Sequence, residues 1–345
     1  MASLQRTGSM TGRKPTSFDI AALAGVSQPT VSRALSGNKA VSEETRARVV
    51  AAAEKLNYKV DRHASSLRSG GASKTIALLF FEDPTPDDSR INPFYLSMVG
   101  ALTRACAKAG YDLLISFQQL SADWHTDFED SRKADGIILL GYGNYLKAKP
   151  RLAQLIEQGT HFVRWGATEE GQIGTTVGSD NRDGGVQAGR HLVGRGARRV
   201  VFLGNADKGA PEFLERYEGL CAALADAGLD PASQYDAIST EEAGRAAMAE
   251  LLLDGHEVDA IFAASDLIAI GAMGLLEEQG MRVPEDIAVI GFDDSPAAHF
   301  LNLTSVNQDT RTAAETLVDT LLVKLEDRAP DSVVLPVELV VRDSA

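Results

Sequence analysis

The chain has 345 residues, of which 44% are hydrophobic, and its formal net charge is −14 at pH 7. This length and apolar content suffice for a large folded core and exclude a disordered protein. No stretch approaches the roughly 18 consecutive apolar residues of a membrane helix, and the first fifteen residues lack the apolar run of a signal peptide, so we expect a cytoplasmic protein. Cys106 and Cys221 have no neighbouring His or Cys, which predicts neither a zinc site nor a disulfide framework.

The charge is distributed unevenly along the chain. Residues 1–72 hold 11 Lys and Arg against 5 Asp and Glu, a net charge of +6, whereas the remaining residues hold 23 against 43, a net charge of −20. A basic segment attracts phosphate and an acidic body repels it. We therefore expect any contact with nucleic acid to be confined to the N-terminal part.

The stretch from Thr16 to Arg33 predicts two short helices joined by a tight turn at Gly25. Ser27 is placed to cap the second helix by accepting a backbone N–H, and Pro29 falls in its first turn. Glutamine pairs well with adenine and arginine with guanine, so the outward face of this helix suits base reading. An ordinary helical hairpin is the alternative, which the local basic charge disfavours. The expected core positions are Ile20, Ala21, Leu23, Ala24, Val26 and Val31, and the expected outward positions are Gln28, Thr30, Ser32 and Arg33.

A third helix is predicted after Val41, with Ser42 as its cap and Thr45 in its first turn, so that three helices share one small core. Residues 59–74 are basic and polar and contain Gly-Gly, which is typical of a linker. Within this linker, residues 62–68 are long enough for about two helical turns, which are unstable alone. We expect this segment to fold only against a partner.

Residues 75–345 alternate between strand and helix patterns, which predicts parallel, doubly wound sheets. The pattern restarts with a helix after Asp180-Asn181, so we expect two lobes. Ligands of such sheets bind beyond the carboxyl ends of the strands. The expected strands are 75–81, 112–116, 136–140, 161–165, 199–203, 235–239, 259–263, 287–292 and a final strand near 333–341.

Enzymatic motifs are missing from the sequence. There is no Walker loop, no Gly-x-Gly-x-x-Gly and no Gly-x-Ser-x-Gly, and the six His residues are scattered. We interpret acidic pairs such as Asp293-Asp294 as turn residues and a strand-end cap. The sequence thus predicts no catalytic residue, no metal site and no cofactor.

An ordered series of motifs covers residues 16–342: DIAALAGVSQPTVSRAL, VSEETRARVVAAAEKLNY, RHASSLRSG, NPFY at 92–95, VGSDN at 177–181, ERYEGL at 215–220, ASDLIAIGAM at 264–273 and VIGFDD at 289–294. In this series the chain resembles the LacI/GalR family of bacterial transcription regulators. The resemblance implies an α/β protein with a helix-turn-helix head and a two-lobed body like that of periplasmic binding proteins, whose lobes are joined by three crossing segments around a cleft.

The family resemblance also implies which residues contact DNA. It assigns operator specificity to the positions of Gln28, Pro29 and Arg33, and it makes Leu67 a wedge that enters the minor groove from a hinge helix. One departure is Lys59-Val60-Asp61, which replaces the family's usual residues and removes an expected phosphate contact. The predicted DNA-binding residues are Ser27, Gln28, Pro29, Thr30, Ser32, Arg33, Thr45, Ala64 and Leu67.

Six residues are candidates for effector binding. Chemistry alone leaves Asp266 open between a helix cap and a hydroxyl-binding carboxylate, and it makes a solvated residue the default for Arg216. The resemblance favours the ligand role for both. Trp165 ends a strand, where an aromatic ring is a core plug or a stacking surface. The full set is Phe94, Tyr95, Trp165, Arg216, Asp266 and Gln308.

The predicted domains are a tail at 1–15, a DNA-binding domain at 16–60, a hinge at 61–74 and a body at 75–345. Lobe 1 is expected at about 75–175 plus 305–326, and lobe 2 at about 176–304 plus 327–345. We expect a homodimeric repressor of near-palindromic operator DNA that responds to a small molecule, with a sugar as the first hypothesis. A solute-binding protein and an enzyme on the same body are the alternatives.

Overall fold

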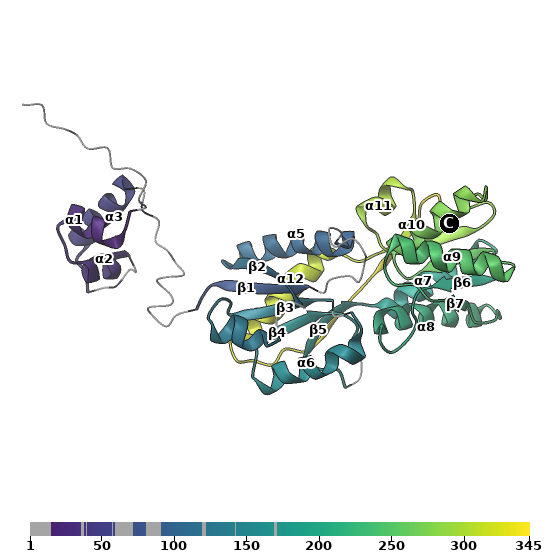
Figure 1. Cartoon of the computed structure of the whole chain (residues 1–345), viewed down its shortest axis with the longest axis horizontal. Helices are drawn as coiled ribbons and strands as arrows, with labels where there is room; N and C mark the ends of the chain where they lie inside the picture. The colour runs from purple at the N-terminus through teal and green to yellow at the C-terminus, as the bar shows by residue number, and fades with distance from the viewer. Residues whose placement is uncertain are drawn as a thin grey trace, which may run out of the picture. The chain divides into compact units, whose positions relative to one another are not determined.

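The computed structural model describes residues 15–35, 38, 40–56, 58, 72–80, 91–118, 122–141, 143–168 and 171–345. The chain divides into two compact units, Met1–Ser73 and Lys74–Ala345 (Figure 1). No helix in these described ranges is long and apolar enough to cross a membrane.

The described part of the N-terminal unit contains three helices, α1 (Ser17–Ala24), α2 (Gln28–Leu35) and α3 (Glu43–Lys55). They share one core in which Ile20, Val31 and Val49 are fully buried, which confirms the predicted three-helix head. Gly25 ends α1 with a positive φ of 65°, a conformation that glycine adopts without steric cost. Ser42 caps α3 as predicted, since its hydroxyl accepts a hydrogen bond from the Thr45 amide at 3.4 Å.

One core prediction in this unit is wrong. Leu23 is 44% exposed, because the face of α1 that meets the other helices carries Ile20, Ala21 and Ala24. The hinge at 61–74 was expected to hold Ala64 and Leu67, and both of these residues lie outside the described residues.

The second unit contains two six-stranded sheets, one in each lobe (Figure 1). All strand pairs are parallel except β10–β12, which confirms the predicted α/β class. Sheet A of lobe 1 has the order β11 (Val333–Leu335), β5 (Thr175–Ser179), β4 (Phe162–Trp165), β3 (Gly136–Leu140), β1 (Thr75–Phe80) and β2 (Asp112–Phe117). Sheet B of lobe 2 has the order β12 (Glu338–Val340), β10 (Thr304–Asn307), β9 (Ala288–Asp293), β8 (Ala260–Ala263), β6 (Val200–Leu203) and β7 (Ser233–Tyr235).

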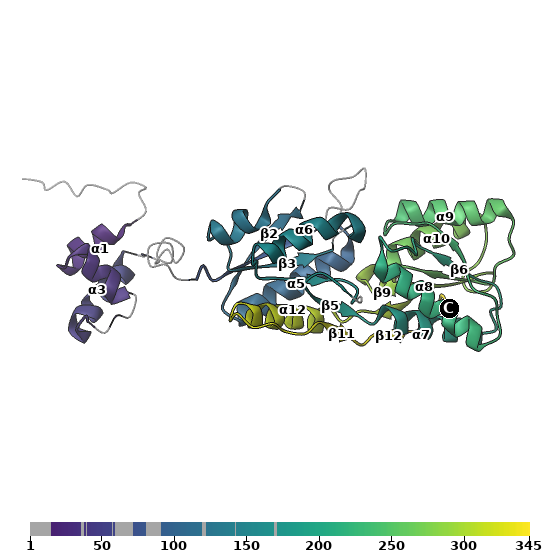
Figure 2. The ribbon, with the colours of Figure 1, turned by 90° about the horizontal axis from the view of Figure 1, so that it is seen from below.

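Helices cover both faces of each sheet. In lobe 1, α5 (Pro93–Lys108) and α12 (Thr310–Lys324) lie on one face, and η2 (His125–Asp130) and α6 (Tyr145–Glu157) lie on the other (Figure 2). Each face of sheet A has its own hydrophobic core. Strand β1 contributes to both, since Leu78 packs in the core beneath α5 and α12 and Leu79 in the core beneath η2 and α6, as the two-residue period of a strand requires. In lobe 2, α7 (Asn181–Gly194) packs on α8 (Pro211–Asp226), and α9 (Glu241–Asp254) packs on α10 (Asp266–Glu278). The short helix α11 (Pro296–Phe300) follows β9.

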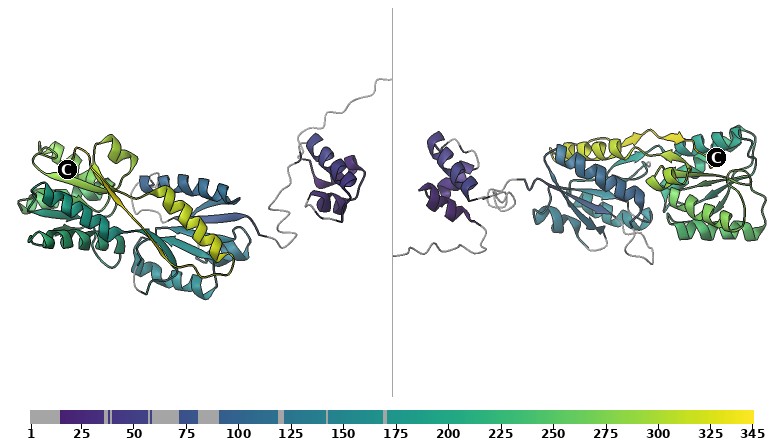
Figure 3. Two further views of the ribbon diagram at one scale, coloured as in Figure 1. Left: turned by 180° about the vertical axis from the view of Figure 1, so that it is seen from behind. Right: turned by 90° about the horizontal axis from the view of Figure 1, so that it is seen from above.

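The chain crosses between the lobes at three places: after β5, after β10 and between β11 and β12. The last crossing is the yellow segment that runs from lobe 1 to lobe 2 (Figure 3). The expected lobe boundaries are therefore wrong by one strand at each crossing, because β5 and β11 belong to sheet A and β10 belongs to sheet B. Pro336 has no amide hydrogen to donate and lies between β11 and β12, where a single final strand was expected.

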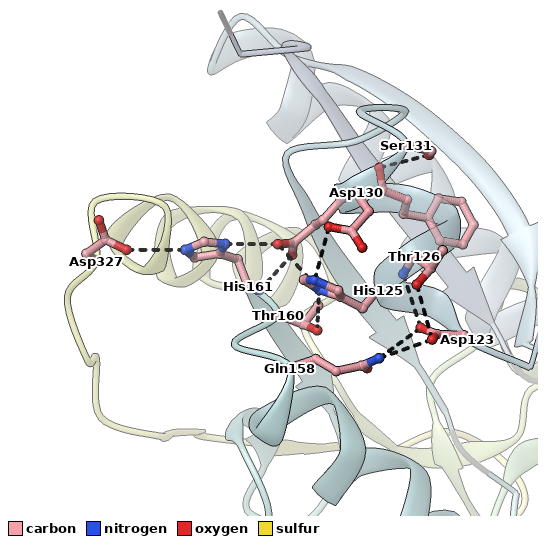
Figure 4. Close-up of polar contacts among 11 residues, drawn as sticks. Asp123, His125, Thr126, Asp130, Ser131, Gln158, Thr160, His161 and Asp327 are labelled. Atoms are coloured by element: carbon pink, nitrogen blue, oxygen red, sulfur yellow. Dashed lines mark hydrogen bonds and ion pairs between the residues drawn. The ribbon is translucent and has the colours of Figure 1, made fainter. Parts of the chain in front are cut away.

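A polar cluster joins three elements at the amino-terminal edge of sheet A (Figure 4). The Glu129 carboxylate in η2 accepts a hydrogen bond from the His161 amide at 2.7 Å, and its second oxygen lies 3.2 Å from Nδ1 of the same residue. His161 Nε2 lies 3.5 Å from the carboxylate of Asp327, which follows α12. His125 contacts the Thr160 hydroxyl at 2.9 Å. Within the described residues, this cluster and the rest of the fold offer no group of three or more residues placed to hold a metal ion.

Candidate effector cleft and nucleic-acid interface

Helix α2 presents two different faces. Val31 and Ala34 are buried against the head's core, whereas Pro29, Ser32 and Arg33 are exposed. Polar and charged side chains exposed in this way on the second helix of a helix-turn-helix are available to a DNA groove. The structure thus leaves Pro29, Ser32 and Arg33 accessible, whereas Gln28 and Thr30, which were also expected to face outward, are half-buried.

The start of α2 differs in detail from the prediction. Ser27 precedes the helix as expected, but its hydroxyl shares a hydrogen bond of 2.9 Å with the Thr30 hydroxyl instead of capping a backbone amide. Gln28 donates to the Ser17 hydroxyl at 3.3 Å, which links the first residues of α1 and α2. Ser17 therefore lies beside Gln28, one of the predicted DNA-reading residues, although no pattern in the sequence pointed to it.

A cavity of about 930 Å³ lies between the two lobes of the second unit. Both lobes line it, and so does Gln308 in the crossing after β10. Five of the six predicted effector residues lie in its lining: Phe94, Tyr95, Trp165, Arg216 and Gln308.

An aromatic wall forms the lobe 1 side of the cavity nearest to α5. The ring of Phe94 lies 6.0 Å from that of Trp165 and 5.6 Å from that of Tyr95. Asn92 caps α5 by accepting a hydrogen bond from the Phe94 amide at 2.9 Å, and Pro93 occupies the first helical position. The local sequence Asn-Pro-Phe-Tyr therefore fixes two aromatic rings at the start of a helix that opens onto the cavity.

Arg216 is held on three sides by lobe 2. Its Nε donates to the side-chain oxygen of Asn181 at 2.9 Å, its Nη1 donates to the carbonyl of Ala264, and its guanidinium lies 3.6 Å from the centre of the Phe292 ring. The residue is only 5% exposed, so the alternative of a solvated arginine is excluded. Burial lowers the pKa of Arg216, but an arginine remains protonated in proteins.

The carboxylate of Asp293 lies close enough to this arginine for their charges to interact. Asp293, at the end of β9, lines the cavity and accepts a hydrogen bond from Gln308 at 2.7 Å. Partial removal from water raises the pKa of Asp293 to about 8, while the positive charge of Arg216 acts in the opposite direction. From the sequence, Asp293 and Asp294 are expected to be turn residues and a strand-end cap, and the cavity lining corrects this for Asp293. Its position at the carboxyl end of a strand was the signal that could have identified it.

Asp266 is the one predicted effector residue that does not line the cavity. Its carboxylate accepts hydrogen bonds from the Ser305 hydroxyl at 2.6 Å and the Ser295 amide at 2.7 Å, behind the cavity wall. Burial raises the pKa of Asp266 to about 6, and these hydrogen bonds oppose the shift. The cap of α10 is Ser265, which lines the cavity in place of its neighbour.

Hydrogen bonds join the lobes around the cavity. Asn92 of lobe 1 donates to the Ser239 hydroxyl of lobe 2 at 3.1 Å. The Ala167 amide donates to Glu212 at 3.0 Å, and the Tyr145 amide donates to the Gly209 carbonyl at 2.8 Å. A molecule in this cavity would touch both lobes.

Comparison with known proteins identifies both units. Residues 18–61 match the model for bacterial regulatory proteins of the lacI family, and residues 190–345 match the periplasmic binding protein-like domain. The HTH-type transcriptional regulator CelR of Thermobifida fusca is 35% identical over 96% of this chain and 98% of its own length. The ribose operon repressor of Escherichia coli K12 is 31% identical over 88% and 91% of the two chains.

Solved structures agree with this assignment. A CelR–cellobiose complex is 33% identical and covers 96% of this chain and 100% of its own, with a TM-score of 0.68. A Lac repressor dimer bound to operator and the anti-inducer ONPF has a TM-score of 0.81 at 24% identity and covers 96% and 99% of the two chains, which shows a shared fold. The chain therefore belongs to the lacI family of bacterial regulatory proteins and is a DNA-binding transcription regulator with an effector-binding domain.

Proposed function

We propose that this protein is a repressor that binds operator DNA as a homodimer and whose operator affinity is set by a sugar bound between the lobes. The observation that carries the proposal is the cavity itself, where a fixed arginine and a carboxylate from lobe 2 face an aromatic wall from lobe 1. Aromatic faces pack on sugar rings, and fixed charged groups hydrogen-bond their hydroxyls. The likeness to CelR, solved with cellobiose, supports a sugar.

The proposed effector contacts are the five predicted residues that line the cavity, together with Asp293 and Ser265. Asp266 acts behind them, because its carboxylate holds the Ser295 amide just beyond the carboxyl end of β9. The proposed DNA contacts of the head are Ser27, Gln28, Pro29, Thr30, Ser32, Arg33 and Thr45, with Ala64 and Leu67 added from the sequence alone.

The proposed mechanism is thermodynamic linkage. A ligand that touches both lobes binds one degree of closure better than another, and it shifts the protein toward that state by its differential affinity. Coupling of this kind is typically worth about 1–3 kcal/mol, or 5–150-fold in operator affinity. Both induction and co-repression are consistent with this linkage, and the sign of the operator response to the sugar distinguishes them.

The test combines operator binding with variants of the cavity. Cellobiose should change the operator affinity of the wild-type protein in a gel-shift titration. Arg216→Ala removes a charge-assisted contact worth on the order of 1.5–3 kcal/mol and should abolish the response, while operator binding without the sugar is kept. Asp266→Ala should weaken the response through loss of its support of Ser295. If cellobiose changes the operator affinity of both variants as it does that of the wild type, the effector does not bind in this cavity.

We further propose that the protein does not turn its ligand over. This follows from the lack of catalytic motifs in the sequence and from the regulatory relatives. Incubation of the protein with cellobiose followed by chromatography should return the sugar unaltered. Formation of a product at a rate that depends on Asp293 would support an enzyme instead.

A further inference from the structure

The charged groups that line the cleft are divided between its two walls. Lobe 1 contributes three cations and, among the described lining residues, no carboxylate. Lobe 2 contributes three carboxylates and one cation. The lobe 1 cations are Lys147, Arg151 and Arg164; the lobe 2 carboxylates are Asp207, Glu212 and Asp293, and its cation is Arg216. Which of these charges are already paired determines the charge that the ligand should carry.

The lobe 2 carboxylates are already engaged within the protein. Asp207 accepts hydrogen bonds from the backbone amides of the turn that precedes α8, including that of Ala210 at 3.2 Å. Glu212 accepts the Ala167 amide across the cleft at 3.0 Å. Asp293 accepts Gln308 and lies beside the positive charge of Arg216. None of these carboxylates therefore requires a cationic ligand.

Two of the lobe 1 cations, Lys147 and Arg151, have no carboxylate partner among the residues that the structure describes. Lys147 and Arg151 lie one turn apart on α6, on the same face as Gln154, and all three line the cavity. Neither cation takes part in an ion pair within 4.0 Å with any residue of the structurally described chain. Their positive charge is therefore available to a ligand.

Arg151 is nevertheless held in place. Its guanidinium lies 4.7 Å from the centre of the buried Trp124 ring and donates to the backbone carbonyl of Gln118 at 3.3 Å. These contacts restrict the side chain without neutralising it. A restrained guanidinium with free donors is well suited to the oxygens of a carboxylate or a phosphate.

We propose that the sugar bound in this cleft carries an anionic group, a carboxylate or a phosphate, that lies against Lys147 and Arg151 on α6. The inference rests on the proposed function and specifies the chemical class of its effector. A neutral sugar would leave the half-buried guanidinium of Arg151, and the exposed ammonium of Lys147 one turn away, without an anionic partner, and removing an unpaired charge from water is unfavourable. The cavity, at about 930 Å³, lies near the upper end of the roughly 300–1,000 Å³ range of ligand pockets, which leaves room for more than one sugar ring.

The test compares three probes of equal length: cellobiose, cellobiouronic acid and cellobiose 6′-phosphate. Calorimetric titration of the full-length protein at low salt should show at least one anionic probe binding about tenfold more tightly than cellobiose, as a charge-assisted contact predicts. The two anionic probes distinguish a carboxylate ligand from a phosphate ligand. The difference in affinity between the anionic probes and cellobiose should shrink as added salt screens the charges.

Matched variants test whether Lys147 and Arg151 are the residues that contact the anionic group. Arg151→Gln and Lys147→Gln should each lower the ratio of anionic to neutral affinity several-fold, and the double variant should remove it. Lys149→Gln is the control, because Lys149 lies on the same helix, loses the same charge and does not line the cavity. An equal loss of the ratio in Lys149→Gln would make the effect one of general charge and would overturn the assigned contact.

Two further outcomes separate this proposal from the proposed function. If cellobiose binds as tightly as both anionic probes and still changes operator affinity, the anionic group is refuted and sugar control stands. If none of the three probes changes operator affinity, sugar control is refuted, and this proposal falls with it.

Discussion

Close packing between α7 and α8 makes Gly185 a sensitive position for both stability and effector binding. A Cβ atom added at Gly185 would lie 2.1 Å from the Arg216 carbonyl oxygen and 2.9 Å from the Leu220 amide nitrogen. Both atoms belong to the backbone of α8, so no side-chain rotation relieves the clash. The helices must separate by roughly 1 Å to restore ordinary contact, which breaks the dense packing between them.

Two opposing terms set the size of the effect of Gly185→Ala. Replacing glycine by alanine in a helix stabilises by up to about 1 kcal/mol. Overpacking of a tight interface costs about 1–3 kcal/mol and sometimes more. We therefore expect a net loss of about 1–2 kcal/mol in the free energy of unfolding. Because α8 carries Arg216, its displacement should also weaken effector binding by several-fold.

The matched control lies on the same helix. A Cβ added at Gly194 meets nothing within 4 Å, so Gly194→Ala should be neutral or slightly stabilising and should leave effector binding unchanged. Urea denaturation and calorimetric titration of the two variants measure both effects. If Gly185→Ala proves as stable as Gly194→Ala, with the same effector affinity, the contact between α7 and α8 does not position Arg216.

Three further predictions concern DNA reading, pH dependence and assembly. Arg33→Ala should cost about 1–3 kcal/mol on the cognate operator, concentrated at one base pair of each half-site, and a uniform loss across sequences in a gel-shift panel would make Arg33 a phosphate contact. Because the folded protein raises the pKa of Asp293 from 3.8 to about 8, its contribution to stability is complete below about pH 4 and is lost as pH rises toward 8. Between pH 5 and pH 8.5, the free energy of unfolding should therefore fall less for Asp293→Asn than for the wild type. Equal falls in the two proteins would exclude a contribution from the titration of Asp293. Light scattering should show a dimer whose half-sites lie about 34 Å apart on the operator, and a footprint over one asymmetric half-site would contradict it.

The parts of the fold that follow from periodicity were predictable from the sequence. Strands such as β1, β3 and β8 are short apolar runs, and the structure buries all of them. Strand β5 was missed because Thr175–Ser179 contains a single large apolar residue, Val177. Its small polar side chains are nevertheless buried between β4 and β11, which only the assembled sheet reveals.

The candidate site shows where sequence reasoning reaches its limit. Asp266 and Ser265 are adjacent in sequence, and both suit a helix start, so only the backbone geometry decides which of them faces the cavity. Arg216 needs three partners from different parts of lobe 2, Asn181, Ala264 and Phe292, to be buried with its charge. Such long-range contacts leave no local pattern in the chain, which is why residue chemistry alone made a solvated arginine the default and only the family resemblance favoured a ligand contact.

Because the chain crosses between the lobes three times, neither lobe is made of one continuous segment, and this affects folding. Lobe 1 is complete only when α12 and β11, from residues 310–335, pack against strands that begin at residue 75. During synthesis, the first-made part of sheet A must therefore wait for the roughly 130 residues between β5 and α12 to emerge before its core can close. Contacts of such long sequence separation slow folding and prolong the exposure of apolar surface. A continuous fragment that ends at β5 would lack the helix that covers α5 and would aggregate, whereas a fragment in which residues 310–335 are joined to β5 by a short linker should fold as an independent lobe.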